Sequence, residues 1–477
     1  MCAVLVPVFD TSYRILHGGN ENKGVKGVRS FKFILLSLLY LLLPLLLLSL
    51  FLQATENITW STLVSRTAGI YAFVWYALQF IITARIRLLE RLIAQDKRLV
   101  LHMLFAIGVL VIVLIHTGFG NEKYISKIQA GLGGTADMVL LWATLFSGLF
   151  FSNYFIRFLP VLKPFRDKIA AVLTLTHERC LLLHYAMPAG MVLLIAHVVL
   201  IPEQGLIVFK AGMAMIGAGP LFVFLYYKIR VSQMLEKDPW KVNKVIFESD
   251  SVFTMLFDPP PGRKIKHRAG QFCYIRPLDR SMPSQSHPFT ISSPPKDRQL
   301  SITVKQLGDF TAKIKEIKCG SSVSIDGPYG DFSYDRVLSG RTLIFIAGGI
   351  GVTPMLSMLG DLSIQDPKRK VILLWGVRSK KDLIRLNEIQ AIGKQMPLFV
   401  FEPVLSREPV WAGLRGRIDK IMLDQVLKRH GVNMDALNQA ACEFFICGPG
   451  PMTMDILQVL KETKIPSCTI HTEQFSF

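Results

Sequence analysis

The chain has 477 residues and a mass of 53.6 kDa, which suggests more than one domain. Hydrophobic residues make up 51% and charged residues 19%, and the mean hydropathy is +0.39, so the chain has ample apolar surface to bury and is not disordered. Residues 1–236 hold 21 basic and 11 acidic side chains and the remainder 33 and 24, so no basic domain stands out and nucleic-acid binding is not indicated.

Long apolar runs dominate the first half of the chain. Residues 33–55 contain no charged side chain, and 23 residues of helix at ~1.5 Å each exceed the ~30 Å hydrocarbon core of a bilayer. We predict an all-α bundle of six spans over residues 31–235, after an N-terminal segment 1–30. The five further uncharged runs are 67–84, 99–121, 138–156, 180–202 and 211–227.

Lysines and arginines in the flanks of these runs predict the orientation. Seventeen of them lie on the side of the N-terminus, whereas Lys123 and Lys127 lie on the opposite side. The uncharged runs predict an integral membrane protein. Because cytosolic flanks carry the excess of positive charge, we expect the side of the N-terminus to be cytosolic. Both termini and everything after residue 230 are then cytosolic.

Four histidines lie within the predicted spans, where ionisable side chains are rare and mark function. His102 and His116 are 14 residues apart in the third span, which puts them on one helix face ~21 Å apart along the axis. The fifth span runs in the same direction, so His184 is level with His102 and His197 with His116. Each level offers two facing nitrogen ligands, as axial haem ligation requires.

The 13 residues from His184 to His197 do not fit a regular helix, since they rotate the second ring by about 220° from the first. We therefore expect a local distortion of the fifth span, for which Pro188 and Gly190 provide a site. The alternative for one or more of the four histidines is a plain hydrogen bond to a neighbouring helix.

After Pro239 the sequence changes to short β-branched segments broken by proline and glycine. The segments before residue 339 predict an antiparallel barrel over residues 236–338. From Leu343 onward, strand–turn–helix repeats predict a mostly parallel α/β domain over residues 339–477. The expected barrel strands are Val242–Phe247, Val252–Phe257, Phe272–Ile275, Leu300–Val304 and Val323–Ile325, and the expected α/β strands are Leu343–Ile346, Val371–Trp375, Leu398–Val404 and Phe444–Ile446.

Four motifs carry chemistry in this half. Gly348-Gly349-Ile350-Gly351-Val352-Thr353-Pro354 lies between a strand and a helix, where glycines allow a pyrophosphate to approach the backbone at a helix N-terminus. Cys447-Gly448-Pro449-Gly450-Pro451-Met452 also follows a strand, so both turns should line one crevice at the carboxyl edge of the sheet. The other two are Ser286-His287-Pro288-Phe289-Thr290-Ile291-Ser292 and the ending Glu473-Gln474-Phe475-Ser476-Phe477.

These four motifs in this order, after a six-span region with paired histidines, resemble the NADPH oxidase and ferric reductase superfamily over nearly the whole chain. The resemblance implies a ferredoxin–NADP reductase fold for the cytosolic half, with FAD, two b-type haems and NADPH as cofactors. It implies that electrons pass from NAD(P)H through FAD to an inner haem (His102, His184) and an outer haem (His116, His197), then to an acceptor on the far face.

The resemblance also implies roles for individual residues. Phe475 would stack on the flavin ring and move aside for the nicotinamide, unless Phe477 is that lid. Cys447 would act beside the nicotinamide. The flavin would contact His287, Pro288, Phe289, Thr290, Gly308 and Thr311, and the nicotinamide dinucleotide would contact Gly349, Gly351, Pro354, Cys447, Gly448 and Pro449.

Three choices stay open. Arg378, with Lys380 and Lys381, falls where the adenosine ribose is read, which favours NADPH over NADH. Arg66 either reaches the membrane interface or contacts the outer haem or the final acceptor. The acceptor is oxygen, giving superoxide, or a ferric chelate or quinone, and Gly120, where some oxidases of the family have a further histidine, argues against an animal-type oxygen site.

A function of another class, a haem-binding membrane carrier or sensor with a regulatory cytosolic half, also fits the paired histidines. The complete flavin and nicotinamide motifs argue against it. The sequence does not identify a protein partner.

Overall fold

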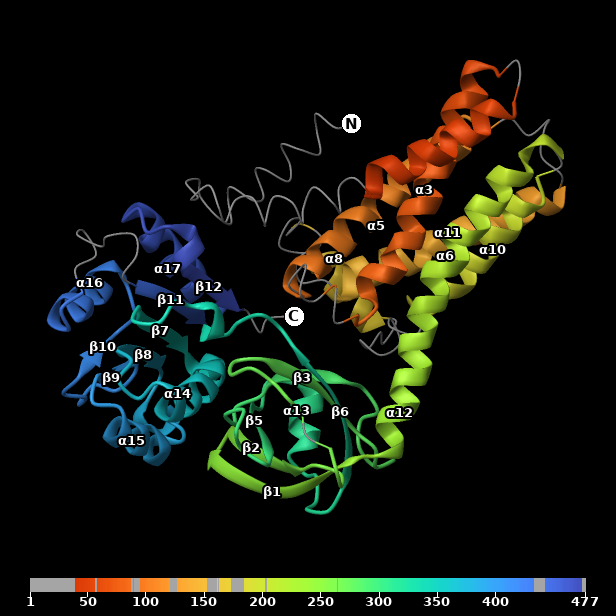
Figure 1. The fold of residues 1–477 in the computed structure, drawn as a ribbon. Coiled ribbons are helices and arrows are strands. Elements are labelled where there is room, and N and C mark those ends of the chain that lie inside the picture. Colours follow the sequence, from red (N-terminus) through yellow and green to blue (C-terminus); the bar gives the residue numbers. More distant parts are fainter. Residues whose placement is uncertain are drawn as a thin grey trace. The chain divides into compact units, whose positions relative to one another are not determined.

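The chain forms two compact units, Arg29–Ser232 and Gln233–Ser476, in the computed structural model (Figure 1). The expected N-terminal segment 1–30, Lys123, Phe475 and Phe477 lie outside the residues that the structure describes. The described residues are 39–55, 58–86, 89, 95–120, 127–151, 161, 163–172, 184–201, 204–263, 265–432 and 442–473.

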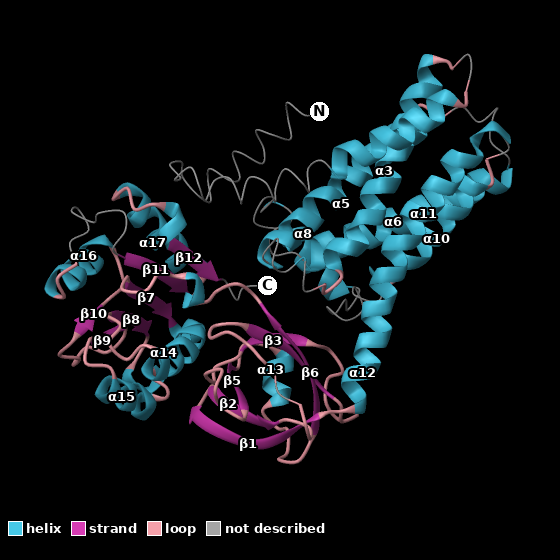
Figure 2. Cartoon of the chain, in the orientation of Figure 1, coloured by secondary structure: helices cyan, strands magenta, loops and turns pink. Residues whose placement is uncertain are grey.

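The described part of the first unit consists of helices joined by short turns and loops (Figure 2). α3 begins after Thr59, whose side chain accepts a hydrogen bond from the backbone N–H of Thr62 and so caps the helix. The last helix, α11, runs through a π-helical turn, Tyr227–Val231, into α12 (Ser232–Lys237). The described helices are Leu39–Gln53, α3 (Trp60–Thr83), α5 (Gln95–Gly118), α6 (Lys127–Phe151), α8 (Lys163–Val172), α10 (Met187–Val199) and α11 (Ile207–Tyr226).

Two described helical segments are long and apolar enough to cross a bilayer, Arg98–Gly118 and Ile207–Lys237. Leu39–Gln53 and Met187–Val199 are apolar but shorter. Long apolar helices also occur in the cores of soluble proteins, so two of them do not establish a membrane location. The six spans and their orientation remain predictions.

The expected distortion of the fifth predicted span is present, but it lies at Tyr185–Ala186 and not at Pro188 and Gly190, which are both helical. Tyr185 and Ala186 form a turn that separates helical His184 from α10, which begins at Met187. Pro188 occupies the first turn of α10, where its missing N–H has no intrahelical partner to lose. The Tyr76 hydroxyl of α3 donates to the Met187 carbonyl at 2.7 Å. Because of this break, the direction of the His184 side chain is not fixed by the helical rotation that sets the direction of side chains in α10.

The second unit begins with the predicted antiparallel barrel. Its six strands pair in the order β4-β3-β6-β1-β2-β5, and an antiparallel bridge between Ile291 and Ile302 joins the two edges. The helix α13 (Asp309–Ile314) contributes Phe310 and Ile314 to the barrel core. The strands are β1 (Trp240–Ser249), β2 (Val252–Asp258), β3 (Phe272–Pro277), β4 (His287–Thr290), β5 (Leu300–Lys305) and β6 (Ser322–Tyr329).

The α/β part has a parallel sheet in the order β10-β9-β8-β7-β11-β12. Its apolar strand residues alternate between two cores. One core includes side chains of α14 (Thr353–Gln365) and α15 (Leu386–Gln395), and the other includes those of α16 (Lys420–Arg429) and α17 (Gly450–Glu462). The strands are β7 (Thr342–Gly348), β8 (Val371–Val377), β9 (Phe399–Leu405), β10 (Leu414–Arg415), β11 (Cys442–Cys447) and β12 (Ile470–Glu473).

Candidate functional site

The two glycine-rich turns meet at the carboxyl ends of the neighbouring strands β7 and β11. After β7 the chain makes a 3₁₀ turn, Gly349–Val352, in which Gly349 has a left-handed φ of 54°, and then enters α14 at Thr353 with Pro354 in its first turn. A Cβ on Gly351 would lie 2.3 Å from the Cys447 carbonyl oxygen, so only glycine fits there. The structure thus brings the two turns together, as the sequence led us to expect.

The Cys447 side chain is fully buried in the core that includes α14. In the sheet it is aligned with Ala347 of β7 on one side and Glu473 of β12 on the other. Burial raises the pKa of the Cys447 thiol well above its usual value, and the Glu473 carboxylate raises it further. Cys447 is therefore a neutral thiol and not a thiolate nucleophile.

The barrel motif forms β4, which pairs with β3 so that Thr290 lies opposite Phe272. The His287 ring stacks on Phe310 with centroids 3.7 Å apart, and the Phe289 ring lies 6.1 Å from the same partner. Phe310 is a site residue that our sequence reasoning missed, although it lies inside the Gly308–Thr311 turn. It fixes the orientation of the His287 ring.

Thr290 is buried, and its hydroxyl has no hydrogen-bond partner among the residues that the structure describes. A buried hydroxyl without a partner costs about 1–3 kcal/mol, so it indicates a group that the protein alone does not supply. Thr290 is also the residue that the resemblance places at the flavin. The residue types in β4 therefore fit a flavin.

The turn before α13 explains Thr311 by local structure. Its hydroxyl accepts hydrogen bonds from the backbone N–H groups of Leu307 at 2.9 Å and Gly308 at 3.0 Å. It donates in turn to the Gly308 carbonyl at 2.9 Å. Gly308 has an extended φ of −165°, which any residue adopts. The Thr311 side chain therefore closes its own turn.

The basic cluster after β8 has an acidic neighbour. Arg378 is exposed, and its carbonyl accepts a hydrogen bond from the Arg407 N–H at 2.7 Å. The Lys380 N–H donates to a Glu408 carboxylate oxygen at 3.1 Å. A carboxylate beside the ribose is typical of NADH sites, whereas an arginine accommodates the extra phosphate of NADPH. Glu408, which the sequence analysis did not single out, favours NADH, whereas Arg378 favours NADPH.

In the helical unit, the four histidines pair two and two as predicted. The His102 and His184 rings have centroids 6.0 Å apart at an interplanar angle of 86°. The His116 and His197 rings have centroids 6.5 Å apart at 89°. A metal bound at about 2 Å from one nitrogen of each ring would separate the two centroids by about 6 Å. Both pairs have this spacing.

Two residues of α3 hold the histidines of α5. The Gln79 amide oxygen lies 2.6 Å from His102 Nδ1, and the Ser65 carbonyl oxygen lies 2.8 Å from His116 Nδ1. Because an oxygen of either kind only accepts, each Nδ1 carries the proton and each Nε2 keeps a free lone pair. This is the tautomer of a metal-binding histidine. The 14-residue spacing of Ser65 and Gln79 equals that of His102 and His116, a signal that the sequence analysis missed.

Two glycines leave space for the rings of His116 and His197, the outer pair. A Cβ on Gly69 of α3 would lie 2.9 Å from the His116 ring, and one on Gly133 of α6 would lie 2.7 Å from the His197 ring. Arg66 follows Ser65 in α3, and the Ser65 carbonyl is the group that holds His116. Both outer histidines thus rest against helix backbones, and a cation stands near one of them.

Two family models match the second unit. An FAD-binding domain matches residues 239–333, and an oxidoreductase NAD-binding domain matches residues 345–458. The chain is an oxidoreductase with FAD- and NAD-binding domains. These matches confirm the flavin and nicotinamide part of our expectation and leave the helical unit unassigned.

Curated relatives of this oxidoreductase match over the same half. A subunit of the Na(+)-translocating NADH-quinone reductase from Neisseria meningitidis is 30% identical over 172 residues, 35% of this chain and 40% of that protein. The Haemophilus influenzae protein of the same name has the same identity and shares. The oxidoreductase thus matches less than half the length of these relatives. Among solved structures, the FAD/NAD-binding domain of a Vibrio cholerae nitric oxide dioxygenase has 23% identity and a TM-score of 0.43, over 50% of this chain and 98% of that one.

The oxidoreductase also has a cavity of about 980 Å³ between the barrel and α15. None of the site residues expected from the sequence lines it. Its walls carry acidic, basic and hydroxyl side chains, with more acidic than basic ones, among them Glu248, Thr254, Arg298, Arg385 and Glu388. The cavity is therefore separate from the glycine-rich turns and from Thr290.

Proposed function

We propose that this oxidoreductase is a six-span membrane protein that passes electrons from cytosolic NAD(P)H through FAD and two b-type haems to an acceptor on the opposite face. The pairing of His102 with His184 and of His116 with His197 carries this proposal. Each pair supplies two protein ligands, and no group of three or more His, Cys, Asp or Glu forms a metal site among the described residues. Two axial ligands suit a metal whose other ligands come from a porphyrin.

When bound, FAD would supply the change from the two-electron chemistry of the nicotinamide to the single-electron transfers of haems. The chain would orient these groups. The buried Thr290 hydroxyl, which has no partner among the described residues, would form a hydrogen bond with the flavin. The β4 residues His287, Pro288 and Phe289 would lie along the flavin. The Gly349–Pro354 turn would hold the dinucleotide phosphates at the N-terminus of α14. We retain Phe475, with Phe477 as the alternative, as the lid over the flavin.

Oxygen is the first acceptor that we propose, with superoxide as the product. Arg66 supports it, because a cation beside the outer histidine pair stabilises an anionic product. A ferric-chelate or quinone reductase is the second candidate. It is favoured by the curated relatives, whose name identifies them as parts of a quinone reductase.

Purified full-length protein tests the proposal. We expect a Soret band, two haems and one FAD per chain, and cytochrome c reduction by NAD(P)H that superoxide dismutase suppresses. Protein that is colourless after expression with abundant haem contradicts the proposal. Rapid reduction of ferric citrate or a quinone with no superoxide would select the second candidate.

His116→Ala tests the ligand assignment. This variant is expected to lose one of its two haems and the reduction of the acceptor, while NAD(P)H still reduces the flavin. His430→Ala is the control, since His430 belongs to the second unit and bonds to Glu402. Two haems retained in His116→Ala would show that His116 is not a ligand.

A further inference from the structure

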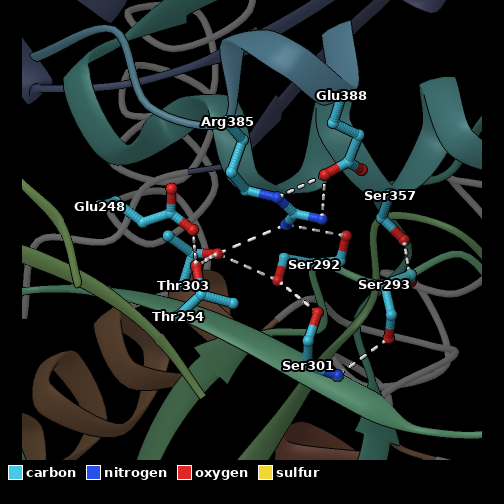
Figure 3. Close-up of polar contacts among 9 residues, drawn as sticks. All are labelled: Glu248, Thr254, Ser292, Ser293, Ser301, Thr303, Ser357, Arg385 and Glu388. Atoms are coloured by element: carbon cyan, nitrogen blue, oxygen red, sulfur yellow. Dashed lines mark hydrogen bonds and ion pairs between the residues drawn. The ribbon is translucent and has the colours of Figure 1, made fainter. Parts of the chain in front are cut away.

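Arg385 links the two domains of the second unit (Figure 3). It precedes α15, and its side chain is only 12% exposed. Its Nε donates to Glu388 at 2.7 Å, within its own helix, whereas Nη1 reaches the barrel. There it donates to the Ser292 carbonyl at 3.5 Å and to the Thr303 hydroxyl at 3.4 Å. The Arg385 guanidinium therefore bonds to Glu388 of the α/β domain and also to the barrel.

A second link lies beside the first. The buried Ser357 hydroxyl of α14 donates to the Ser293 carbonyl at 2.8 Å. Further along α14, a Cβ on Gly360 would lie 3.3 Å from the Pro294 ring, which shows close packing. The consecutive residues Ser292, Ser293 and Pro294, here called the strap, therefore dock on both α14 and α15.

The strap connects the two cofactor sites. It begins two residues after Thr290, whose hydroxyl has no partner in the described protein. The helix that it docks on, α14, begins directly after the Gly349–Val352 turn. A shift of α14 along the strap would therefore change the position of the dinucleotide turn relative to Thr290.

The strap itself is fixed to the barrel by side chains. The Ser301 N–H donates to the Ser293 hydroxyl at 3.0 Å, and the Ser292 and Ser301 hydroxyls are 3.0 Å apart. The Thr303 hydroxyl donates to the Ser292 hydroxyl at 3.2 Å. Thr303 continues this network to Thr254 and Glu248 (Figure 3). The barrel end of the link is therefore held by several hydrogen bonds, and Arg385 is one of the contacts that set how the α/β domain packs on it.

Two observations set Arg385 apart from an ordinary surface arginine. It adopts a left-handed backbone conformation with φ 53°, which is rare for a side chain of this size and persists where surrounding contacts impose it. It also lines the 980 Å³ cavity, into which polar side chains of both domains face. Polar contacts contribute to the alignment there, and a guanidinium presents five donors in a fixed planar fork, whereas a lysine ammonium presents three on a flexible stem.

We propose that Arg385 is a positioning residue for hydride transfer between the nicotinamide and the flavin. In that step a C–H bond of the dihydronicotinamide breaks and hydrogen leaves with its electron pair to form an N–H bond on FAD, so NAD(P)H is oxidised as the flavin is reduced. Arg385 is not among the residues expected to contact either group. It holds α14 and α15 on the strap, which fixes the distance over which the hydride moves. The inference rests on the proposed flavin and nicotinamide sites and not on the haems.

Anaerobic rapid mixing of full-length Arg385→Met with NADPH tests this role. We expect the limiting rate of flavin reduction to fall roughly 10- to 100-fold, since small misplacements of reacting groups have effects of that size. The charge-transfer absorbance between nicotinamide and flavin should weaken, while FAD content stays and the Kd for NADPH changes less than about two-fold. Arg385→Lys should recover only part of the rate. Arg429→Met, an arginine paired with Glu402 and 56% exposed, is the matched control and should react as the wild type does.

An unchanged limiting rate in Arg385→Met overturns the proposal. So does a rate that falls only with a parallel rise in Kd, because Arg385 would then belong to the binding site. If Arg385→Met loses FAD or fails to fold, Ser357→Ala decides, since it removes the other link: a lower rate with normal Kd supports the proposal and a wild-type rate overturns it. Wild-type protein without FAD would instead refute the proposed flavin site.

Discussion

At the scale of single residues, glycine identity is the most direct link between sequence and site. Gly351 lies where any Cβ would meet the Cys447 carbonyl at 2.3 Å, whereas a Cβ on Gly450, in the neighbouring turn, meets nothing within 4 Å. Backbone atoms cannot move aside as a flexible side chain does. The two glycines share a motif type and differ in what surrounds them.

Gly351→Ala should therefore force apart the two turns. Overpacking of this kind costs about 1–3 kcal/mol, so we expect a lower midpoint in denaturant unfolding of the second unit and weaker NAD(P)H binding. Gly450→Ala serves as the control and should leave both within error. Equal behaviour of the two variants would show that the turns do not touch as described.

Cys447 offers a second prediction at this scale. Its pKa is raised by burial and by Glu473, while Cys319 is exposed. Iodoacetamide reacts with thiolates, so at about pH 8 we expect mass spectrometry to find Cys319 modified and Cys447 intact, with NAD(P)H oxidation retained. Rapid labelling of Cys447, with loss of flavin reduction, would contradict the buried neutral thiol.

At the scale of elements, sequence reasoning predicted every strand that has a run of β-branched or aromatic residues. It missed β4, β10 and β12. β4 contains His287 and Pro288, β10 is only two residues long, and β12 has a single β-branched pair around His471. These strands exist because neighbouring strands supply partners, which local sequence does not reveal. The break before α10 was predicted because a helix cannot satisfy the 13-residue histidine spacing, a constraint that does not depend on neighbours.

The same reasoning shows why the partners of the histidines escaped prediction. Ser65 and Gln79 are ordinary polar residues until α3 is known to pack along α5. Their 14-residue spacing acquires meaning only beside that of His102 and His116. Pairing of helices, like pairing of strands, had to come from the structure.

Gln79→Leu tests whether α3 holds the proposed haem ligands in place. It removes the acceptor of the His102 Nδ1–H, and loss of such a partner typically weakens metal binding about 10–100-fold. We expect lower haem content or a shifted midpoint potential for one haem, read by pyridine haemochrome assay and redox titration. Ser61→Ala is the control, because its hydroxyl lies 3.2 Å from the Thr59 hydroxyl at the start of α3 and holds neither histidine in the part of the chain that the structure describes. Equal effects of the two substitutions would contradict the assignment.

At the scale of the whole molecule, the two compact units divide the proposed labour. The FAD- and NAD-binding domains lie within Gln233–Ser476, and the four paired histidines lie within Arg29–Ser232. The barrel is closed by the Ile291–Ile302 bridge, and the parallel sheet has a core on each face. Neither core requires a helix of the first unit. The reduction of the flavin by NAD(P)H should therefore be separable from the proposed transfer of electrons through the haems.

We expect residues 236–477, expressed alone, to bind FAD and reduce ferricyanide with NAD(P)H, because hydride transfer needs only the second unit. The fragment should contain no haem and should produce little superoxide. The full chain with His102→Ala and His116→Ala is the matched comparison, since it keeps the first unit and loses one ligand of each pair. A fragment that binds FAD but reduces no acceptor would mean that the helical unit completes the flavin site. Haem bound by the fragment would place the metal ligands outside the paired histidines.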